Sequence, residues 1–232
     1  MTGHRMNEHG QPIGLPVDGS FPRPLPPRSP MTGRFVSLEP TRADHAEALF
    51  EAFAKDDSGA NWTYLPGEPL PDLATAQDWI SRCAESSDPL FHTLCTPDGT
   101  PVGIASYLRI DPANGVIEVG HIHFSPLLQR SPAATEAMYL MMKRAFDELG
   151  YRRYEWKCDA LNAPSRRAAE RLGFNYEGTF RQAVVTKGRN RDTAWFSILD
   201  TEWPRLRARF EAWLAPANFD AEGRQIARLS DL

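Results

Sequence analysis

Two histidines, His121 and His123, stand two residues apart in an alternating run that ends at Phe124. Successive side chains of a strand point to opposite faces, so residues two apart share one face. An imidazole with an ordinary pKa near 6.5 can accept a proton, directly or through water, or bind a metal. The pair therefore marks the end of this strand as a place for acid–base or metal chemistry.

Carboxylates and aromatic side chains that could receive an amine occur around this pair. Glu118, Glu155 and Asp159 could attract a cationic amine, and Glu118 and Asp159 are also the next candidates for a base after the histidines. Three large aromatic residues could wall an acceptor pocket, although such residues are more often core: Trp62, Tyr64 and Trp195.

Directly after Phe124, residues 125–137 read as a tight loop that leads into a helix. Ser131 suits the N-cap position, and Pro132 suits the first helical position, where its missing N–H costs nothing. The free N–H groups of a first turn and the positive end of the helix dipole favour a pyrophosphate. The small residues Ser131, Ala133 and Ala134 would let it approach, and Arg130 and the Thr135 hydroxyl could add a charge and a donor.

The periodicity of apolar residues predicts the elements that position these groups. Helices are expected over residues 44–55, 72–85, 131–149, 162–172 and 202–214, and strands over 35–38, 91–95, 102–110, 116–124, 153–158, 174–185 and 192–199. The strand–helix–strand order in the middle implies one parallel pair, with antiparallel strands on both sides. The expected fold class is therefore α/β with a mixed sheet.

The order of elements, the loop 129–135 and the later segment 162–174 together resemble the GNAT N-acetyltransferases, above all the branch of ribosomal-protein N-terminal acetyltransferases. The resemblance runs from about Gly33 to Trp203. It implies a mostly antiparallel central sheet with a parallel pair at the cofactor site and helices on both faces. It divides the chain into a Pro-rich arm (1–30), the GNAT domain (31–203), and a C-terminal helix and tail (204–232).

The same resemblance implies acetyl-CoA as the co-substrate, bound by Phe124, the loop 129–135, Asn162 and Ser165. The family's phosphate loop reads Arg/Gln-x-x-Gly-x-Gly/Ala, so Pro132 replaces a glycine and removes one backbone donor. Asn162 would bond the pantetheine arm or the substrate, and Ser165 would lie near the sulfur as the acid. Ala169 stands where many members carry a tyrosine, and Val184 where this branch carries its carboxylate.

An amine that attacks a thioester needs a proton acceptor and a stabilised oxyanion. His121 and His123 are the first candidates for the base, and a backbone N–H near residues 123–124 is the candidate oxyanion donor. Cys158 ends a strand on its apolar face, so direct attack is favoured over a covalent intermediate. Acetyl is the expected acyl group, with succinyl or another small group open, and the acceptor is a peptide, amino acid, polyamine or drug amine.

Composition limits the partners of the chain. A net charge of −4 offers no basic excess for nucleic acid, and no stretch reaches the roughly 18 apolar residues that would span a membrane. Three cysteines without a CxxC pair indicate reduced thiols and a cytoplasmic location. The appended arm and the C-terminal helix could serve a homodimer.

Two other function classes stay open. The first is a non-catalytic domain of the same fold that binds acyl-CoA or a partner, which Pro132 and the missing carboxylate favour. The second is a metal-dependent hydrolase that would use His121, His123 and Asp159 as ligands; the acyltransferase reading expects no metal.

Overall fold

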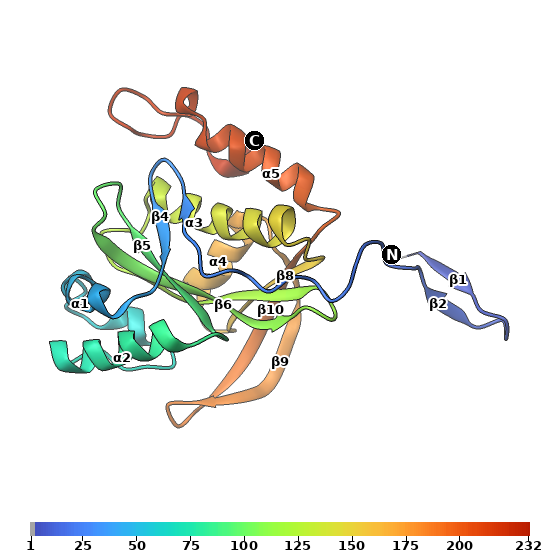
Figure 1. Cartoon of the computed structure of the whole chain (residues 1–232), viewed down its shortest axis with the longest axis horizontal. Coiled ribbons are helices and arrows are strands. Elements are labelled where there is room, and N and C mark those ends of the chain that lie inside the picture. The colour runs from blue at the N-terminus through green and yellow to red at the C-terminus, as the bar shows by residue number, and fades with distance from the viewer. Residues whose placement is uncertain (1–2) are drawn as a thin grey trace.

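An eight-stranded sheet runs through the computed structural model, which describes residues 3–232 (Figure 1). In spatial order its strands are β3 (Met31–Thr32), β4 (Ser37–Pro40), β5 (Leu90–Cys95), β6 (Pro101–Asp111), β7 (Val116–Phe124), β8 (Arg153–Asp159), β10 (Arg189–Leu199) and β9 (Asn175–Thr186). β7 and β8 are parallel, and every other neighbouring pair is antiparallel. The predicted mixed sheet with one parallel pair is confirmed.

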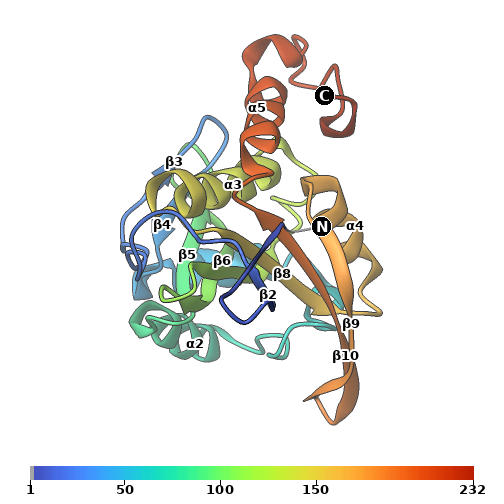
Figure 2. The same ribbon diagram turned by 90° about the vertical axis from the view of Figure 1, so that its right-hand side faces the viewer.

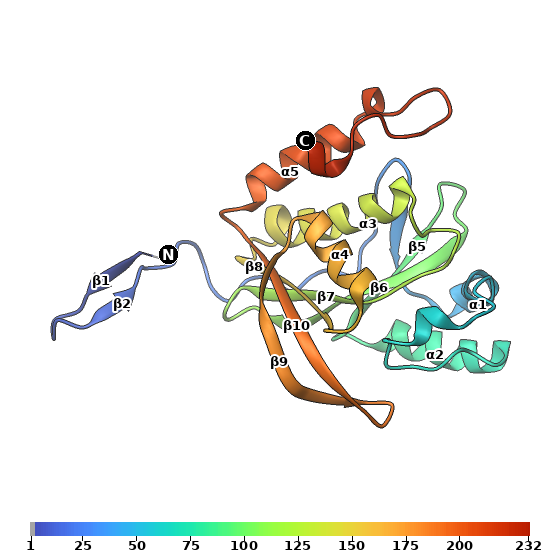
Figure 3. The ribbon, with the colours of Figure 1, turned by 180° about the vertical axis from the view of Figure 1, so that it is seen from behind.

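Helices cover both faces of this sheet, as the sequence predicts (Figures 1 and 3). One face carries α1 (Ala46–Phe53) and α2 (Leu73–Glu85); the other carries α3 (Pro132–Lys143), α4 (Ala163–Leu172) and α5 (Trp203–Leu214). A π-helical turn (Arg144–Glu148) extends α3, and short 3-10 turns span Ala43–His45, Ala60–Trp62, Pro216–Asn218 and Leu229–Asp231. None of the helices within residues 3–232 combines the length and apolar character that crossing a membrane requires.

Alternation along β7 and β8 divides their side chains between the two faces. Ile117 and Val119 on β7 and Tyr154, Trp156 and Cys158 on β8 belong to the main core beneath α3, α4 and α5. A smaller core under α1 and α2 contains Phe53, Phe91 and Ile104 among others. The residues between these positions on β7 and β8 therefore face the same side as α1 and α2.

The strand predicted over residues 35–38 begins later in the structure, as β4 at Ser37. The buried Glu136 carboxylate on α3 accepts the backbone N–H groups of Arg34, Phe35 and Val36 at 2.8, 2.6 and 3.1 Å. A carboxylate that accepts several N–H groups replaces a strand partner for this segment. β4 pairing therefore starts at Ser37, a long-range effect that local periodicity does not contain.

The Pro-rich arm is more ordered than its composition suggests. A two-stranded hairpin, β1 (His4–Met6) with β2 (Pro12–Gly14), projects from the body in Figure 1 and lies in front of it in Figure 2, which looks from that end. The chain then returns to α3, where Arg144 donates to the carbonyl oxygens of Ser29 and Pro30 at 2.8 and 2.9 Å. The arm is thus fastened to the domain at its C-terminal end.

Candidate active site

β7 and β8 separate at their carboxyl ends. Their parallel pairing stops at Val119 opposite Trp156, although β7 continues to Phe124 and β8 to Asp159. A bulge accompanies the separation, because two residues of β7, His121 and Ile122, stand opposite one residue of β6. His121 has a φ of 47°, a left-handed conformation that costs a non-glycine residue energy and that bulges near active sites often contain.

Two helices begin beside this gap. α3 follows β7 and α4 follows β8, and ligand sites of such sheets lie at the carboxyl ends of the parallel strands. The Ser131 hydroxyl caps α3 by accepting the N–H of Ala134 at 3.2 Å. The Asn162 side-chain oxygen caps α4 by accepting the N–H of Ser165 at 3.1 Å, which leaves the Asn162 amide nitrogen as a donor. The positive ends of two helix dipoles therefore border the gap.

The loop before α3 has the form of an anion site. Arg130 is left-handed, with φ 57°, and within residues 3–232 no acceptor binds the backbone N–H groups of Arg130 and Ser131. Successive N–H groups around a left-handed residue form concave anion sites. The Gln129 side chain supports the loop, because its Nε2 donates to the Phe124 carbonyl at 2.8 Å and to Asn61 Oδ1 at 3.0 Å.

The remaining predicted loop residues differ in their exposure. The Arg130 side chain is exposed, and Ala133 and Ala134 are half-buried at the start of α3. Thr135 is buried, and its hydroxyl accepts a hydrogen bond from Arg171 at 3.1 Å. Thr135 therefore lies on the side of α3 that faces α4.

Ser165 lies in the first turn of α4, close to β8. Its Oγ accepts the indole N–H of Trp156 at 3.0 Å, so the hydroxyl proton remains free to be donated elsewhere. Burial raises the pKa of the neighbouring Cys158 thiol, an effect that the Ser165 hydroxyl partly opposes. A raised pKa keeps this thiol protonated at neutral pH.

His121 is half-buried and forms a hydrogen bond that determines its tautomer. The Ser106 Oγ lies 3.1 Å from His121 Nδ1 and 3.1 Å from the carbonyl oxygen of Gly120. The carbonyl can only accept, so both bonds form together only when the hydroxyl donates to it and Nδ1–H donates to the hydroxyl. This arrangement leaves a lone pair on His121 Nε2. Burial, and then Arg109, lower the pKa of His121.

His123 has a different environment, although it is only two residues away. Its ring stacks on Phe53 at 3.9 Å between centroids and meets Trp62 edge-on at 4.3 Å. Burial lowers its pKa to about 4, and within the described chain no partner binds its buried Nδ1. His123 is therefore a neutral part of an aromatic wall at pH 7.

A cavity of about 160 Å³ brings both histidines together with Trp62. Its lining residues come from the loop 62–67, α2, β5 and β7: Trp62, Leu65, Pro66, Gly67, Trp79, Phe91, His121 and His123. Sequence reasoning named three of these residues. It did not predict Trp79 or Phe91 at this place, because residues 62, 79, 91 and 121 meet only in the folded chain.

The predicted carboxylates lie in a network of ion pairs. Glu118 is 4% exposed and binds Arg109 at 2.7 Å and Lys157 at 2.8 Å. Lys157 also binds Glu155 at 2.7 Å, and Arg153 binds Glu155 at 2.6 Å. Each carboxylate therefore already has two cationic partners.

Asp159, Tyr64 and Trp195 lie beside the gap but do not line the cavity. The Asp159 carboxylate accepts the N–H of Leu161 at 2.9 Å, and the Tyr64 hydroxyl donates to the Leu161 carbonyl at 3.2 Å. Trp195 lies under the Lys157 ammonium, 3.8 Å from the ring centroid, and stacks on Phe180. Asp159 and Tyr64 therefore bind the loop that follows β8, and Trp195 packs against Lys157 on β8.

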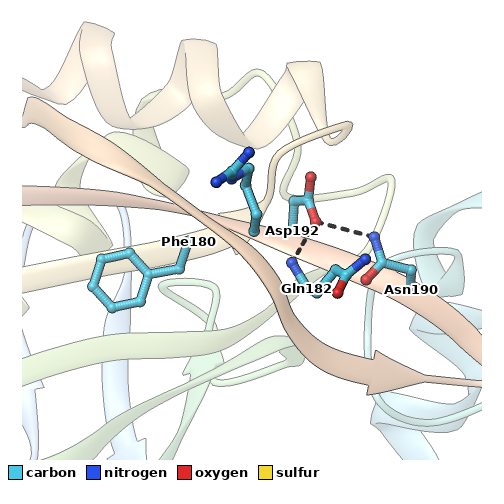
Figure 4. A pocket seen from close by; sticks show the side chains of 5 residues that line it. Phe180, Gln182, Asn190 and Asp192 are labelled. Atoms are coloured by element: carbon cyan, nitrogen blue, oxygen red, sulfur yellow. Dashed lines mark hydrogen bonds between the residues drawn. The ribbon is translucent and has the colours of Figure 1, made fainter.

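A larger hollow, of about 720 Å³, lies along the β9–β10 ribbon. Its lining residues are Phe180, Arg181, Gln182, Asn190 and Asp192 (Figure 4). The Asp192 carboxylate accepts the Gln182 N–H at 2.7 Å and the Asn190 amide at 3.0 Å, so its polar groups bind one another. The smaller cavity, in contrast, is lined by two residues from the separated end of β7, His121 and His123.

Within residues 3–232, no three His, Cys, Asp or Glu side chains are grouped so that they could hold a metal. His121 bonds Ser106, His123 stacks on Phe53, and Asp159 bonds the backbone of Leu161. Among the described residues, His121, His123 and Asp159 therefore do not form the metal-ligand set that a metal-dependent hydrolase would require.

The parallel pair of strands thus separates beside two helix N-termini, and a cavity with two histidines lies on one side of it. A model of the acetyltransferase (GNAT) domain matches residues 36–175. The crystal structure of a GCN5-related N-acetyltransferase from Brucella melitensis is 50% identical, with a TM-score of 0.90, over 92% of this chain and 98% of that one.

Two curated Bacillus proteins are also similar. The uncharacterized N-acetyltransferase p20 of Bacillus licheniformis is 27% identical over 148 residues, 60% of this chain and 80% of p20. YdaF of Bacillus subtilis, provisionally described as a ribosomal N-acetyltransferase, is 29% identical over 106 residues, 46% of this chain and 57% of YdaF. The chain belongs to the GNAT acetyltransferase family and is an N-acetyltransferase.

Proposed function

We propose that this N-acetyltransferase moves an acetyl group from acetyl-CoA to a primary amine by direct attack, with the thioester in the gap between β7 and β8. The separation of the strands after Val119 and Trp156 carries the proposal, because it opens a slot between two helix N-termini. One protein with the same fold, MccE, has been solved in complex with acetyl-CoA and AMP; it is 19% identical with a TM-score of 0.63.

The loop 129–131 is suited to the pyrophosphate despite Pro132. The free N–H groups of Arg130 and Ser131 replace the donor that proline lacks, and the exposed Arg130 side chain adds a positive charge. The Asn162 amide nitrogen, at the start of α4, is available for the pantetheine arm. Phe124, at the end of β7, lies beside the gap.

Acetyl-CoA supplies an activated thioester when it is bound. The amine approaches from the α1–α2 side, and His121 Nε2 accepts its proton as the C–N bond forms. A backbone N–H at the separated end of β7 stabilises the oxyanion. The C–S bond then breaks, and CoA leaves as a thiolate to which the Ser165 hydroxyl donates a hydrogen bond; a thiol has a pKa near 8.5, so no proton has to be transferred from Ser165, and the proton on His121 passes to solvent. Trp156 holds that hydroxyl in place.

Direct attack is favoured because the cysteines are poor nucleophiles. Burial raises the pKa of Cys83 to about 12 and of Cys95 to about 11, and it also raises that of Cys158. A thiol reacts as its thiolate, so these groups stay inactive at neutral pH. Three buried free thiols also fit a cytoplasmic protein, and the projecting hairpin β1–β2 would be the part that serves a homodimer.

A thermal-shift titration with acetyl-CoA, CoA and dephospho-CoA tests the cofactor site first. Binding to the native state stabilises it by about 2.7 kcal/mol at a hundredfold excess over Kd. Arg130→Gln is expected to weaken binding several-fold, whereas Lys55→Gln, an equal loss of charge at an exposed helix end, is expected to leave it unchanged. No shift at millimolar acetyl-CoA would overturn the proposal.

Release of CoA thiol in the presence of primary amines tests the reaction itself. Thiol release that depends on both the amine and acetyl-CoA supports the proposed transfer. Binding of acetyl-CoA without thiol release for any amine would instead favour the non-catalytic alternative.

A further inference from the structure

The cavity beside His121 has no charged wall. Aromatic and aliphatic groups make up most of its lining: Trp62, Leu65, Pro66, Gly67, Trp79 and Phe91. The two imidazoles complete it, and burial lowers the pKa of both, so both are neutral at pH 7. The only polar atoms that these rings offer are nitrogens that accept or donate single hydrogen bonds.

Two carboxylates in the surroundings of the cavity are bound by other groups of the protein. Glu118 is buried between Arg109 and Lys157. Asp56, whose charge acts on His123, accepts the Ser58 hydroxyl at 2.6 Å and the Asn61 N–H at 3.0 Å. None of the lining residues is a carboxylate, so a cationic group in the cavity would lose its water without a counter-charge in the wall, which costs several kcal/mol.

The volume of the cavity sets the size of its occupant. A 150 Å³ cavity with an apolar lining stays dry and binds benzene in a well-studied engineered protein. At about 160 Å³, this cavity holds a group the size of one phenyl ring. Its aromatic walls, in which Trp62 meets His123 edge-on, also suit a flat ring.

The wall formed by residues 61–67 is held from three directions. The Lys187 ammonium donates to the Trp62 carbonyl at 2.7 Å, and Arg189 donates to the Thr63 carbonyl at 3.2 Å, both from the β9–β10 ribbon. Gln129 of the phosphate loop bonds Asn61 at 3.0 Å. The cavity is thus formed before any ligand binds, and pre-formed pockets select by shape.

We propose that this cavity selects the acceptor, and that it takes a compact, uncharged apolar group next to the primary amine, of the size of a phenyl ring. The inference rests on the proposed acetyl transfer, because His121 lies both on the separated part of β7 and in the cavity wall. A group seated in the cavity lies beside His121, which forms part of the same wall as Trp62 and Trp79. Polyamines and lysine side chains are then poor occupants.

Three amides with the same α-amino group test this selectivity. Phenylalaninamide and norleucinamide carry uncharged side chains, and lysinamide is the charged counterpart of norleucinamide. We expect acetyl-CoA-dependent thiol release with a kcat/KM at least tenfold higher for the two uncharged amides than for transfer to the α-amine of lysinamide. Equal rates for all three amides would overturn the inference but leave the acetyl transfer intact.

A charge placed in the cavity wall sharpens the test. Leu65 is half-buried in the loop and lines the cavity. Leu65→Glu is expected to raise the rate with lysinamide and to lower that with phenylalaninamide, each several-fold, whereas the neutral Leu65→Gln keeps the original order. If Leu65→Glu changes the preference among acyl-CoA chain lengths instead of amines, the cavity holds the acyl group and the inference is wrong.

Tryptophan emission gives a readout that does not depend on turnover. Trp62 and Trp79 line the cavity, so phenylalaninamide is expected to change the emission saturably with CoA present, and lysinamide is not. Leu65→Glu should weaken the phenylalaninamide signal. A missing signal would overturn the inference even if no amine is acetylated, whereas a signal without any acetylation would refute only the proposed reaction.

Discussion

The sheet face beneath α1 and α2 has two halves of opposite character. Over β5, β6 and the end of β7 it is neutral and aromatic, with Phe53, Trp62, Trp79 and His123 packed ring against ring. From the end of β6 across β7 and β8 to β9 it is ionic, and three cations alternate with three carboxylates: Arg109, Glu118, Lys157, Glu155, Arg153 and Glu177. The gap between β7 and β8 lies between these halves.

The two halves have different tasks, one structural and one concerned with the amine, and the sequence alone does not distinguish them. The ionic half is balanced, so it holds the strands in place and has no free negative charge for a cationic amine. The neutral half favours an amine in its uncharged, nucleophilic form. Carboxylates close to a predicted site are therefore not evidence of a cationic substrate until their partners are known.

Lys157→Met is expected to break the ionic half. It removes the cation shared by Glu118 and Glu155, which are 4% and 8% exposed, and leaves each with one partner. Breaking a buried pair from one side costs about 3–5 kcal/mol. Urea unfolding measures the loss, and adding Glu118→Gln to Lys157→Met should restore part of it. A loss below about 1 kcal/mol would mean that the network behaves like a surface pair.

His123→Phe is expected to protect the neutral half against acid. Burial lowers the pKa of His123 from 6.5 to about 4. The stability that the neutral ring contributes to the folded protein is therefore complete above pH 6.5 and is lost as the pH falls toward 4. The loss amounts to about 3 kcal/mol at pH 4. Phenylalanine keeps the stack on Phe53 and cannot be protonated.

Urea unfolding at pH 7 and pH 4 compares the two proteins. His92, another buried histidine with a pKa lowered to about 4, titrates in both and cancels. The difference in stability between the two pH values should therefore be smaller in His123→Phe by about 3 kcal/mol. If the difference in stability between the two pH values is the same in both proteins, the pKa of His123 is not lowered by folding.

His121→Gln is expected to lower kcat by about 10²-fold, because general bases contribute at least that much. Acetyl-CoA binding should stay unchanged, since the residue faces the acceptor cavity. Because burial lowers the pKa of His121, the wild-type rate should persist below pH 6.5 as the pH falls. Ser106→Ala, which frees the tautomer, should have a smaller effect. An unchanged kcat in His121→Gln would assign the proton to water or to another group.

Much of this frame is present in the sequence, because it depends on local signals. The apolar stripe of residues 131–149, with Ser131 and Pro132 at its start, predicts α3, and the strands on both sides of it predict the parallel pair. The motif around Asn162 and Ser165 places α4 beside the gap. Caps and periodicity act within a few residues, so a single chain reveals them.

The contents of the site depend on contacts between distant segments. Residues 62, 79, 91 and 123 form one cavity, and Glu118 meets Lys157 across two strands. The bond from Gln129 to Asn61 joins the phosphate loop to the cavity wall. Side-chain pairs of this kind follow from strand order and bulges, which no local pattern contains, so the sequence predicted the groups but not their partners.

Trp156→Phe is expected to have the smallest effect. It tests the other face of the sheet, beneath α3 and α4, where Trp156 contacts Ser165. The indole N–H of Trp156 donates to Ser165 Oγ at 3.0 Å, so its loss frees the hydroxyl to rotate while an aromatic ring still fills the core. A neutral hydrogen bond contributes about 0.5–1.5 kcal/mol, which corresponds to a two- to tenfold lower kcat. The KM for acetyl-CoA should not change.

The double variant with Ser165→Ala separates positioning from packing. If Trp156 acts through the Ser165 hydroxyl, Trp156→Phe should lower kcat in the wild type but have almost no effect in the Ser165→Ala protein, because the group that it positions is gone. An equal reduction in both backgrounds would mean that the indole contributes only to the core. The hydroxyl of Ser165 would then have to be held by the helix turn alone.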